Sequence, residues 1–298
     1  MMAIMDSLGQ FSGSLLLVGA GNMGSAMLDG WLGLGLSPER VTVLEPHPGP
    51  TVAALAGRGM RLNPETAHEP ATVAVLAVKP QNAAEVLPML RSMVGAQTLV
   101  VSIMAGKTIK FLEDGLAPGA PIVRSMPNTP AAIGRGITVA TPNARVTDAQ
   151  RAIAHALLAA IGSVEWVDDE SLLDGVTAVS GSGPAYVFLL AESLARAGVA
   201  AGLPAALAAR LARETVAGAG ELLQRSRLDP STLRQNVTSP GGTTAAALAV
   251  LMGEGGLDRL MEQAVAAAAD RSRELRADPL PPDGHKPAYN LRSGSSGG

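Results

Sequence analysis

A glycine-rich turn is the most informative chemical feature near the beginning of the chain. It follows the apolar run 14–19, precedes an amphipathic stretch, and consists of Gly19, Ala20, Gly21, Asn22, Met23 and Gly24. In such a turn the first glycine permits a sharp bend, the second lets the backbone approach a pyrophosphate, and the third lets a helix pack closely on a strand. Amides at the helix start then bind the anion. The spacing predicts a dinucleotide site, and the alternative is a plain structural turn.

An acidic residue, Glu45, stands at the end of the apolar run 41–44, about 20 residues after Gly24. A carboxylate at this spacing is placed to accept hydrogen bonds from both ribose hydroxyls, and it would repel a 2′-phosphate. No Arg or Lys follows before Arg58, and Arg40 lies at the other end of the same strand. This local chemistry favours NADH over NADPH. The alternative is that Glu45 only points into solvent.

Three further segments follow apolar runs, at places where the strands of a parallel sheet would end. They are 77–80, 102–106 and 124–130. Ligands of such sheets bind outside the carboxyl ends of the strands, so we expect these segments to line the same crevice. The third segment holds Asn128 in a rigid turn between prolines, and we expect this asparagine at the cofactor. The alternatives are an ordinary surface corner at that turn and a solvated charge at Lys79.

Two segments in the second half combine glycine amides with hydroxyl groups where helices should begin. They are 180–186, which contains Pro184, and 239–244, which contains Pro240 and two threonines. A helix start of this composition suits a small carboxylate. Each segment alone would be explained by helix capping. Together, beside a dinucleotide fold, they indicate a substrate that carries a carboxylate.

The elements that must position these groups alternate between strands and helices in the first half. Nearly continuous apolar runs predict buried parallel strands at 14–19, 41–44, 72–78, 98–103 and 121–126. Helices are predicted at 22–34, 51–57 and 81–93, and a strand pair, 136–140 and 164–167, flanks a helix at about 147–160. This rhythm predicts an α/β fold whose N-terminal part is a Rossmann-type, doubly wound, mostly parallel sheet.

After about residue 168 the strand pattern stops and Ala-rich helical stretches follow at 183–201, 204–226, 242–253 and 257–276. We therefore predict a dinucleotide-binding domain over 14–167 and an all-α domain over 168–276. The apolar helical domain is expected to form a homodimer, with a larger ring of dimers as a further form, and an ordinary monomeric bundle is the alternative. The polar tail 277–298 is predicted to be disordered and in part left over from cloning.

Composition excludes several classes of protein. The net charge is −3 and the pI about 5.8, so no basic field exists to bind nucleic acid or an anionic membrane. Cysteine is absent and the four histidines lie far apart in the sequence, so we predict no metal site. No apolar run reaches the ~20 residues of a membrane helix, and the first residues do not resemble a signal peptide. We expect a cytoplasmic protein.

Six motifs, in this order and at these spacings, resemble those of pyrroline-5-carboxylate reductases: GAGNMG, AVKPQ, VVSIMAG, RSMPNTP, VSGSGPAYVF and SPGGTT. The match covers roughly residues 14–276, and the last three motifs are far more specific than a dinucleotide fingerprint. The resemblance implies a nicotinamide-binding domain followed by a helical domain that interlocks between subunits. It also implies reduction of (S)-1-pyrroline-5-carboxylate to L-proline with NADPH or NADH, the last step of proline biosynthesis.

The resemblance implies roles for single residues as well. The cofactor would be bound by the turn from Gly19 to Gly24 and, largely through the backbone, by Ala77, Val78, Lys79, Pro80, Ile103, Met104 and Ala105. The substrate would meet Glu170, Asn236, Gly241, Gly242, Thr243 and Thr244. Of these, Thr244 would lie nearest the ring nitrogen and is the expected catalytic residue. Glu45 departs from the small polar residues that the family often carries there. This chain is therefore expected to accept or prefer NADH, whereas the family commonly uses NADPH.

Two other interpretations stay open. The first is a two-domain dehydrogenase of the β-hydroxyacid type, which would normally need a Lys or His base near the start of the helical half. Residues 168–190 contain neither, which counts against it. The second is a protein that binds the nucleotide without catalysis, and the intact SPGGTT segment argues against that.

Overall fold

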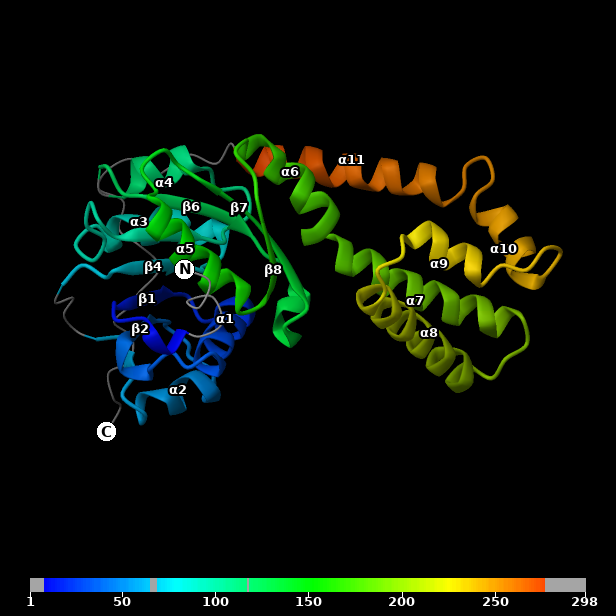
Figure 1. The fold of residues 1–298 in the computed structure, drawn as a ribbon, viewed down its shortest axis with the longest axis horizontal. Helices are drawn as coiled ribbons and strands as arrows, with labels where there is room; N and C mark the ends of the chain where they lie inside the picture. Colours follow the sequence, from blue (N-terminus) through cyan, green and yellow to red (C-terminus); the bar gives the residue numbers. More distant parts are fainter. Residues whose placement is uncertain (1–7, 65–68, 117, 277–298) are drawn as a thin grey trace. The chain divides into compact units, whose positions relative to one another are not determined.

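The computed structural model describes residues 8–64, 69–116 and 118–276, and these residues form two compact units. The sheet unit comprises residues 8–181 and 269–276, and the helical unit comprises residues 182–268. The chain thus leaves the sheet unit once and returns to it with its last described turns (Figure 1). The tail predicted to be disordered, 277–298, lies outside the described residues.

One sheet forms the centre of the sheet unit, with strands in the order β3-β2-β1-β4-β5-β6-β7-β8 (Figure 1). Its first six positions have the strand order of a doubly wound dinucleotide-binding sheet. Within this sheet β6 and β7 are antiparallel and the other neighbours are parallel. The strands are β1 (Leu15–Val18), β2 (Val41–Leu44), β3 (Arg61–Leu62), β4 (Val73–Leu76), β5 (Leu99–Ser102), β6 (Ile122–Met126), β7 (Gly136–Pro142) and β8 (Gly162–Trp166). The predicted fold class is confirmed.

The register of the central strands decides which residues meet at the edge of the sheet. Val18, the last residue of β1, pairs with Leu44 of β2 and with Leu76 of β4. Leu76 in turn pairs with Ser102, the last residue of β5. Because these strands are parallel and end at the same level, the segments that follow them leave the sheet at one edge.

Helices cover both faces of this sheet, because alternate side chains of a strand point to opposite sides. On one face Leu15 and Leu17 of β1 pack with apolar residues of α1, α2 and α5, and on the other face Leu16 and Val18 pack with residues of α3 and α4. The bounds are α1 (Asn22–Gly33), α2 (Pro50–Ala56), α3 (Ala83–Leu90), α4 (Ile109–Gly115) and α5 (Asp148–Ala159). Both core layers consist mainly of Leu, Val, Ile and Ala.

The predicted strands and helices agree with the observed ones to within a few residues, and four short strands or helices of the described residues were missed. These are β3, α4, α6 (Leu173–Val176) and α9 (Pro230–Asn236), which have two, seven, four and seven residues. An element of this length shows too few turns or alternations to give a periodic signal. The helix predicted over 81–93 is a 3₁₀ turn, Pro80–Asn82, followed by α3, which ends at Leu90.

The helical unit consists of α7 (Gly183–Ala200), α8 (Ala205–Arg225), α9 (Pro230–Asn236), α10 (Thr243–Leu251) and most of α11 (Leu257–Leu275). Small residues bring α7 and α8 together, since a Cβ on Gly198 would lie 3.1 Å from that of Ala208. Many large apolar side chains of this unit are exposed, for example Phe188 at 64% and Val250 at 77%. None of the described helices has the length and apolar character needed to cross a membrane.

The domain boundaries predicted at 167/168 do not coincide with those of the compact units. Residues 168–181, with the 3₁₀ turn Glu170–Leu172, α6 (Leu173–Val176) and the π-helical turn Thr177–Gly181, belong to the sheet unit, as do residues 269–276. The chain changes from strands to helices at about residue 168, but it still packs against the sheet unit up to Gly181 and joins the helical unit only at Ser182. Sequence patterns detect the first change and not the second.

Trp31 of α1 connects the helix after the glycine-rich turn to α5. Its side chain is fully buried, and its indole N–H donates a hydrogen bond of 2.8 Å to the carbonyl of Leu157. Removing one partner of a buried hydrogen bond costs about 1–3 kcal/mol. We therefore expect Trp31→Phe to lower the free energy of unfolding by about this amount, as measured by urea denaturation at fixed protein concentration.

Trp166→Phe is the matched control for this substitution. Trp166 donates to His155 Nδ1 at 3.2 Å, but its side chain is only partly buried, so water replaces the lost bond. We expect a clearly smaller change in stability. Equal losses in the two variants would show that the bond between Trp31 and Leu157 is not what joins α1 to α5.

Candidate functional site

The glycine-rich turn lies between β1 and α1, with backbone packed directly on backbone. Gly19 has φ +92°, and a Cβ there would lie 2.7 Å from the carbonyl oxygen of Ala77. A Cβ on Gly24 would lie 2.2 Å from the carbonyl oxygen of Gly19, whereas a Cβ on Gly21 would meet nothing within 4 Å. The conformational roles predicted for the first and third glycines are confirmed. The second leaves open space beside the amino end of α1, where an anion would be bound.

A cavity of about 560 Å³ opens in front of this turn. It is lined by the ends of four segments that the strand register brings to one edge of the sheet. The lining residues are Gly21, Asn22, Met23, Ala77, Val78, Lys79, Pro80, Ile103, Met104, Ala105, Met126 and Pro127. Ten of these were predicted as cofactor-binding residues, and Met126 and Pro127 belong to the third predicted segment. The side chain of Lys79 is exposed at this cavity, where its charge would attract a phosphate-bearing ligand.

The carboxylate of Glu45 turns back onto the glycine-rich turn. One oxygen accepts a hydrogen bond from the amide of Ala20 (2.8 Å), and the other accepts from the amide of His47 (3.0 Å). Asn63 holds the backbone of Glu45 from both sides, accepting from its N–H and donating to its carbonyl, each at 2.8 Å. The carboxylate therefore does not point freely into solvent. It has a fixed place beside the turn and keeps further lone pairs for a ligand hydroxyl.

Asn128 has a structural partner as well as its predicted role. Its side-chain oxygen accepts a hydrogen bond of 2.9 Å from the amide of Ile137 in β7, and this bond ties the turn after β6 to the next strand. Asn128 is not among the residues that line the cavity, although the preceding Met126 and Pro127 are. Its contact with a cofactor stays a prediction.

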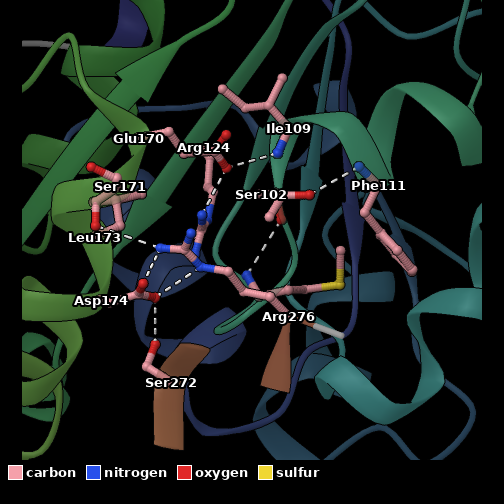
Figure 2. A network of polar contacts seen from close by, with 12 residues as sticks. Ser102, Ile109, Phe111, Arg124, Glu170, Ser171, Leu173, Asp174, Ser272 and Arg276 are labelled. Atoms are coloured by element: carbon pink, nitrogen blue, oxygen red, sulfur yellow. Dashed lines mark hydrogen bonds and ion pairs between the residues drawn. The ribbon is translucent and has the colours of Figure 1, made fainter. Parts of the chain in front are cut away.

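Glu170 is engaged within the sheet unit. Its Oε1 accepts hydrogen bonds from Arg124 Nη1 (2.7 Å) and from the amide of Ile109, the first residue of α4 (2.8 Å), as Figure 2 shows. The Arg124 side chain is 3% exposed and that of Glu170 is 28% exposed. Next to it, hydrogen bonding to Ser171 holds the pKa of the Asp169 carboxyl below its usual value. The role of Glu170 in binding substrate stays a prediction, and its observed partner is Arg124.

Arg124 was missed as a site residue, although the sequence carries a signal for it. It is a charged residue inside the apolar run 121–126, and a buried arginine requires an anionic partner. The sequence could not name that partner, because Glu170 lies 46 positions away along the chain.

The segment between α9 and α10 gathers the other predicted substrate residues in the helical unit. Asn236 ends α9, Gly242 is the N-cap of α10, and Thr243 and Thr244 are its first two residues. A glycine N-cap supplies no side-chain oxygen to the first amides of the helix, and Gly242 makes no side-chain cap bond here. The helix start thus keeps the donors that a small carboxylate would accept from.

The other predicted helix start is confirmed, because α7 begins at Gly183 with Pro184 in its first turn. What the sequence did not predict is the π-helical turn over Thr177–Gly181, which follows α6 without a break and precedes this helix. The hydroxyl of Ser180 donates to the carbonyl of Val176 at 3.0 Å, and Ser182 at the N-cap of α7 makes no side-chain cap bond. π-Turns concentrate at functional sites, but this serine hydroxyl is already used within its own helix.

Comparison with known proteins identifies the family. Residues 170–275 match the family model described as pyrroline-5-carboxylate reductase dimerisation, and residues 14–106 match that of NADP oxidoreductase, coenzyme F420-dependent. The chain is 40% identical to a pyrroline-5-carboxylate reductase of Pseudomonas aeruginosa over 265 residues. The aligned region covers 88% of this chain and 96% of that protein. This chain belongs to the pyrroline-5-carboxylate reductase family. A relative of the same name from Synechocystis is 42% identical over 263 residues, 87% of this chain and 97% of that one.

Solved structures of the family have the same fold. The pyrroline-5-carboxylate reductase of Coxiella burnetii superposes with a TM-score of 0.80 at 34% identity and covers 89% of this chain and 98% of that chain. The pyrroline carboxylate reductase of Plasmodium falciparum, solved with NADP bound, has a TM-score of 0.75 at 30% identity and covers 89% and 99% of the two chains. The family resemblance predicted from the six motifs is confirmed.

Gly24→Ala should disturb the cavity, because the added methyl group would lie 2.2 Å from the carbonyl oxygen of Gly19. Overpacking of this kind costs about 1–3 kcal/mol. If the turn opens to relieve the clash, the affinity for NAD(P)H should fall by about 5–150-fold. Titration of nucleotide fluorescence with the purified protein measures this.

Gly33→Ala is the matched control, since Gly33 ends the same helix and a Cβ there would meet nothing within 4 Å. Its affinity for NAD(P)H should equal that of the unchanged protein. Retained affinity in Gly24→Ala would mean that the close packing of α1 on β1 does not shape the cofactor site.

Proposed function

We propose that this protein reduces (S)-1-pyrroline-5-carboxylate to L-proline with NADPH or NADH. The observation that carries the proposal is the cavity in front of the glycine-rich turn, whose lining is the predicted set of strand-end residues. The relatives that cover nearly the whole chain are named for this activity. A β-hydroxyacid dehydrogenase and a non-catalytic nucleotide-binding protein receive no comparable support.

The cavity residues fit a dinucleotide. Where the pyrophosphate of a dinucleotide must come close to the protein backbone, Gly21 offers open space instead of a side chain. Ala77, Ile103 and Ala105 offer small or apolar side chains and backbone groups, and Lys79 offers a positive charge at the cavity. A bound nicotinamide supplies the hydride for the reaction. The residues of the chain have to orient that ring and exclude water from it.

The reaction makes modest chemical demands on the protein. A protonated cyclic imine is already electrophilic at the carbon that accepts the hydride, so the protein needs no covalent nucleophile. Its main task is to hold the reacting atoms at about 3–3.5 Å in a water-poor cleft. The amides of residues 241–244 at the start of α10 bind the substrate carboxylate. Asn236 and Glu170 complete the set of polar groups proposed for the substrate.

Thr244 is the proposed catalytic residue. Its hydroxyl donates a hydrogen bond to, or relays a proton for, the ring nitrogen, while the helix start holds the carboxylate. Thr244 is half-buried in the first turn of α10, so its side chain is held by packing and still reaches a ligand.

The helical unit is proposed to form a homodimer in which its exposed apolar side chains are covered. Contiguous apolar surface on a folded chain marks an interaction site, and the family model that matches residues 170–275 is named for dimerisation. A ring of dimers is the proposed larger assembly. The absence of cysteine supports the proposal that the enzyme works in the cytoplasm.

The preference between NADH and NADPH is proposed to depend on Glu45, whose carboxylate is fixed beside the turn by Ala20. Absorbance at 340 nm, with pyrroline-5-carboxylate and each reduced cofactor in turn, tests the reaction and the preference together. We expect turnover with a lower KM for NADH. In Glu45→Ser the ratio of kcat/KM values should shift towards NADPH, because the charge that repels a 2′-phosphate is gone.

Glu39→Ser serves as the control for a general change in charge, since Glu39 lies before β2 and outside the cavity. An unchanged cofactor ratio in Glu45→Ser would show that Glu45 does not contact the ribose. A protein that binds both nucleotides and oxidises neither would contradict the proposed function itself.

Thr244→Ala should lower kcat by roughly 10–10³-fold, the range expected for the loss of one general-acid or polar contact in the transition state. Thr244→Ser keeps the hydroxyl and should retain most of the rate. Steady-state kinetics at saturating cofactor measures both variants. Equal rates for Thr244→Ala and the unchanged enzyme would remove this hydroxyl from the mechanism.

A further inference from the structure

A buried polar cluster attaches the end of α11 to the sheet unit. The Asp174 side chain is 4% exposed, and it accepts hydrogen bonds from Ser272 Oγ at 2.9 Å and from Arg276 Nε at 3.0 Å. A second guanidinium nitrogen, Arg276 Nη2, bonds the other carboxylate oxygen, so the pair is bidentate (Figure 2). Ser272 is itself buried. Asp174 lies 98 positions before Ser272 and 102 positions before Arg276 along the chain, and none of the three was predicted as a site residue.

The composition of this cluster makes its geometry specific. A buried carboxylate is costly unless its lone pairs are satisfied, and here three donors satisfy them. The fork of an arginine matches both oxygens of a carboxylate, which a lysine ammonium does not. The last turn of α11 is therefore held in one position on α6.

That position brings α11 onto the loop that lines the cofactor cavity. Gly106, with φ +74°, directly follows Ile103, Met104 and Ala105, and a Cβ on it would lie 3.1 Å from Cβ of Leu275 and 3.3 Å from the carbonyl oxygen of Leu275. Leu275 stands immediately before Arg276. The helix end and the loop thus touch with no side chain of residue 106 between them.

The rest of the loop is fixed at both of its ends. Where it leaves β5, the amide of Met104 donates to Ser102 Oγ at 3.3 Å. Where it enters α4, the amide of Ile109 donates to Glu170, which is paired with the buried Arg124 (Figure 2). Between these two points the contact of Leu275 with Gly106 restrains the middle of the loop from the side.

We propose that Asp174, Ser272 and Arg276 are positioning residues for cofactor binding. They hold Leu275 against Gly106, and this contact keeps residues 103–105 in the shape that lines the cavity. The inference rests on the proposed function of that cavity as the NAD(P)H site. The last turn of α11 thereby sets how tightly the cofactor is bound, although none of the residues of this turn lines the cavity.

The test compares two arginines on the same helical segment. Arg276→Met removes the donors to Asp174 and keeps much of the apolar stem. Arg271→Met is the matched control, because Arg271 is 66% exposed and its ion pair among the described residues is local, with Glu274 at 2.7 Å. Both variants of the full chain are assayed for NADH and NADPH affinity by nucleotide fluorescence, and for KM and kcat by absorbance at 340 nm.

Arg276→Met should raise Kd and KM for the cofactor roughly 10-fold, less than the ~10²-fold that a 1 Å misplacement can cause. The value of kcat at saturating cofactor should change by less than about 2-fold, because the bound cofactor restores the loop. Arg276→Lys should recover part of the affinity, and Arg271→Met should match the unchanged protein. If the cluster had only a structural role, Arg276→Met would lower the melting temperature but would not raise KM for the cofactor selectively over kcat.

The proposal would be overturned if Arg276→Met bound the cofactor with unchanged affinity at a temperature where circular dichroism shows that the variant is folded. If Arg276→Met does not fold, Gly106→Ala tests the same contact from the loop, and unchanged affinity there would equally overturn it. Gly24→Ala separates a failure of the positioning role from a failure of the proposed cofactor site. If Gly24→Ala loses affinity while Arg276→Met keeps it, only the positioning role fails, and if the unchanged protein binds neither nucleotide, the assignment of the cavity fails.

Discussion

The packing of α1 on β1, with no side chain between two backbones, is the constraint on which the rest of this structure depends. The carbonyl oxygen of Gly19 occupies the space where a side chain of Gly24 would begin. This contact directs the amino end of α1 at the edge of the sheet. Because β1, β4 and β5 end there in register, the helix start and the loops after β4 and β5 converge on one cavity. Glu45 follows β2 at the same edge and accepts a hydrogen bond from the amide of Ala20.

The chemistry proposed for this chain explains why the site contains so few reactive side chains. Transfer of a hydride to a protonated imine requires orientation more than acid–base groups. The sheet unit accordingly offers backbone, small or apolar side chains and one lysine at the cavity. In the helical unit, the segment proposed for the substrate offers amides and two hydroxyls at the start of α10. Two acidic residues of the sheet unit lie away from this cavity. Glu170 and Asp174, four positions apart, pair with Arg124 and Arg276, and we propose that the second pair positions the cofactor loop.

Much of the fold was predictable because apolar periodicity and turn residues are local properties. The five predicted buried strands were located to within a few residues, as were the helices predicted after the first, second and third of them, and the cavity is lined by residues of the segments expected there. Short elements such as β3 and α9 were missed because they have too few residues for a period. The partners of Glu170 were missed because a charge pair across 46 positions leaves no local pattern.

The sequence by itself determined the element types, the nucleotide turn and the family, since each is written in contiguous residues or in motifs with fixed spacing. Tertiary structure alone decided that residues 168–181 and the end of α11 belong with the sheet, and that Leu275 lies on Gly106. It also decided that Glu45 is held by the amide of Ala20 and does not point into solvent. The physical reason is that burial and hydrogen bonding depend on which distant segments meet, and the order of residues along a chain does not state this.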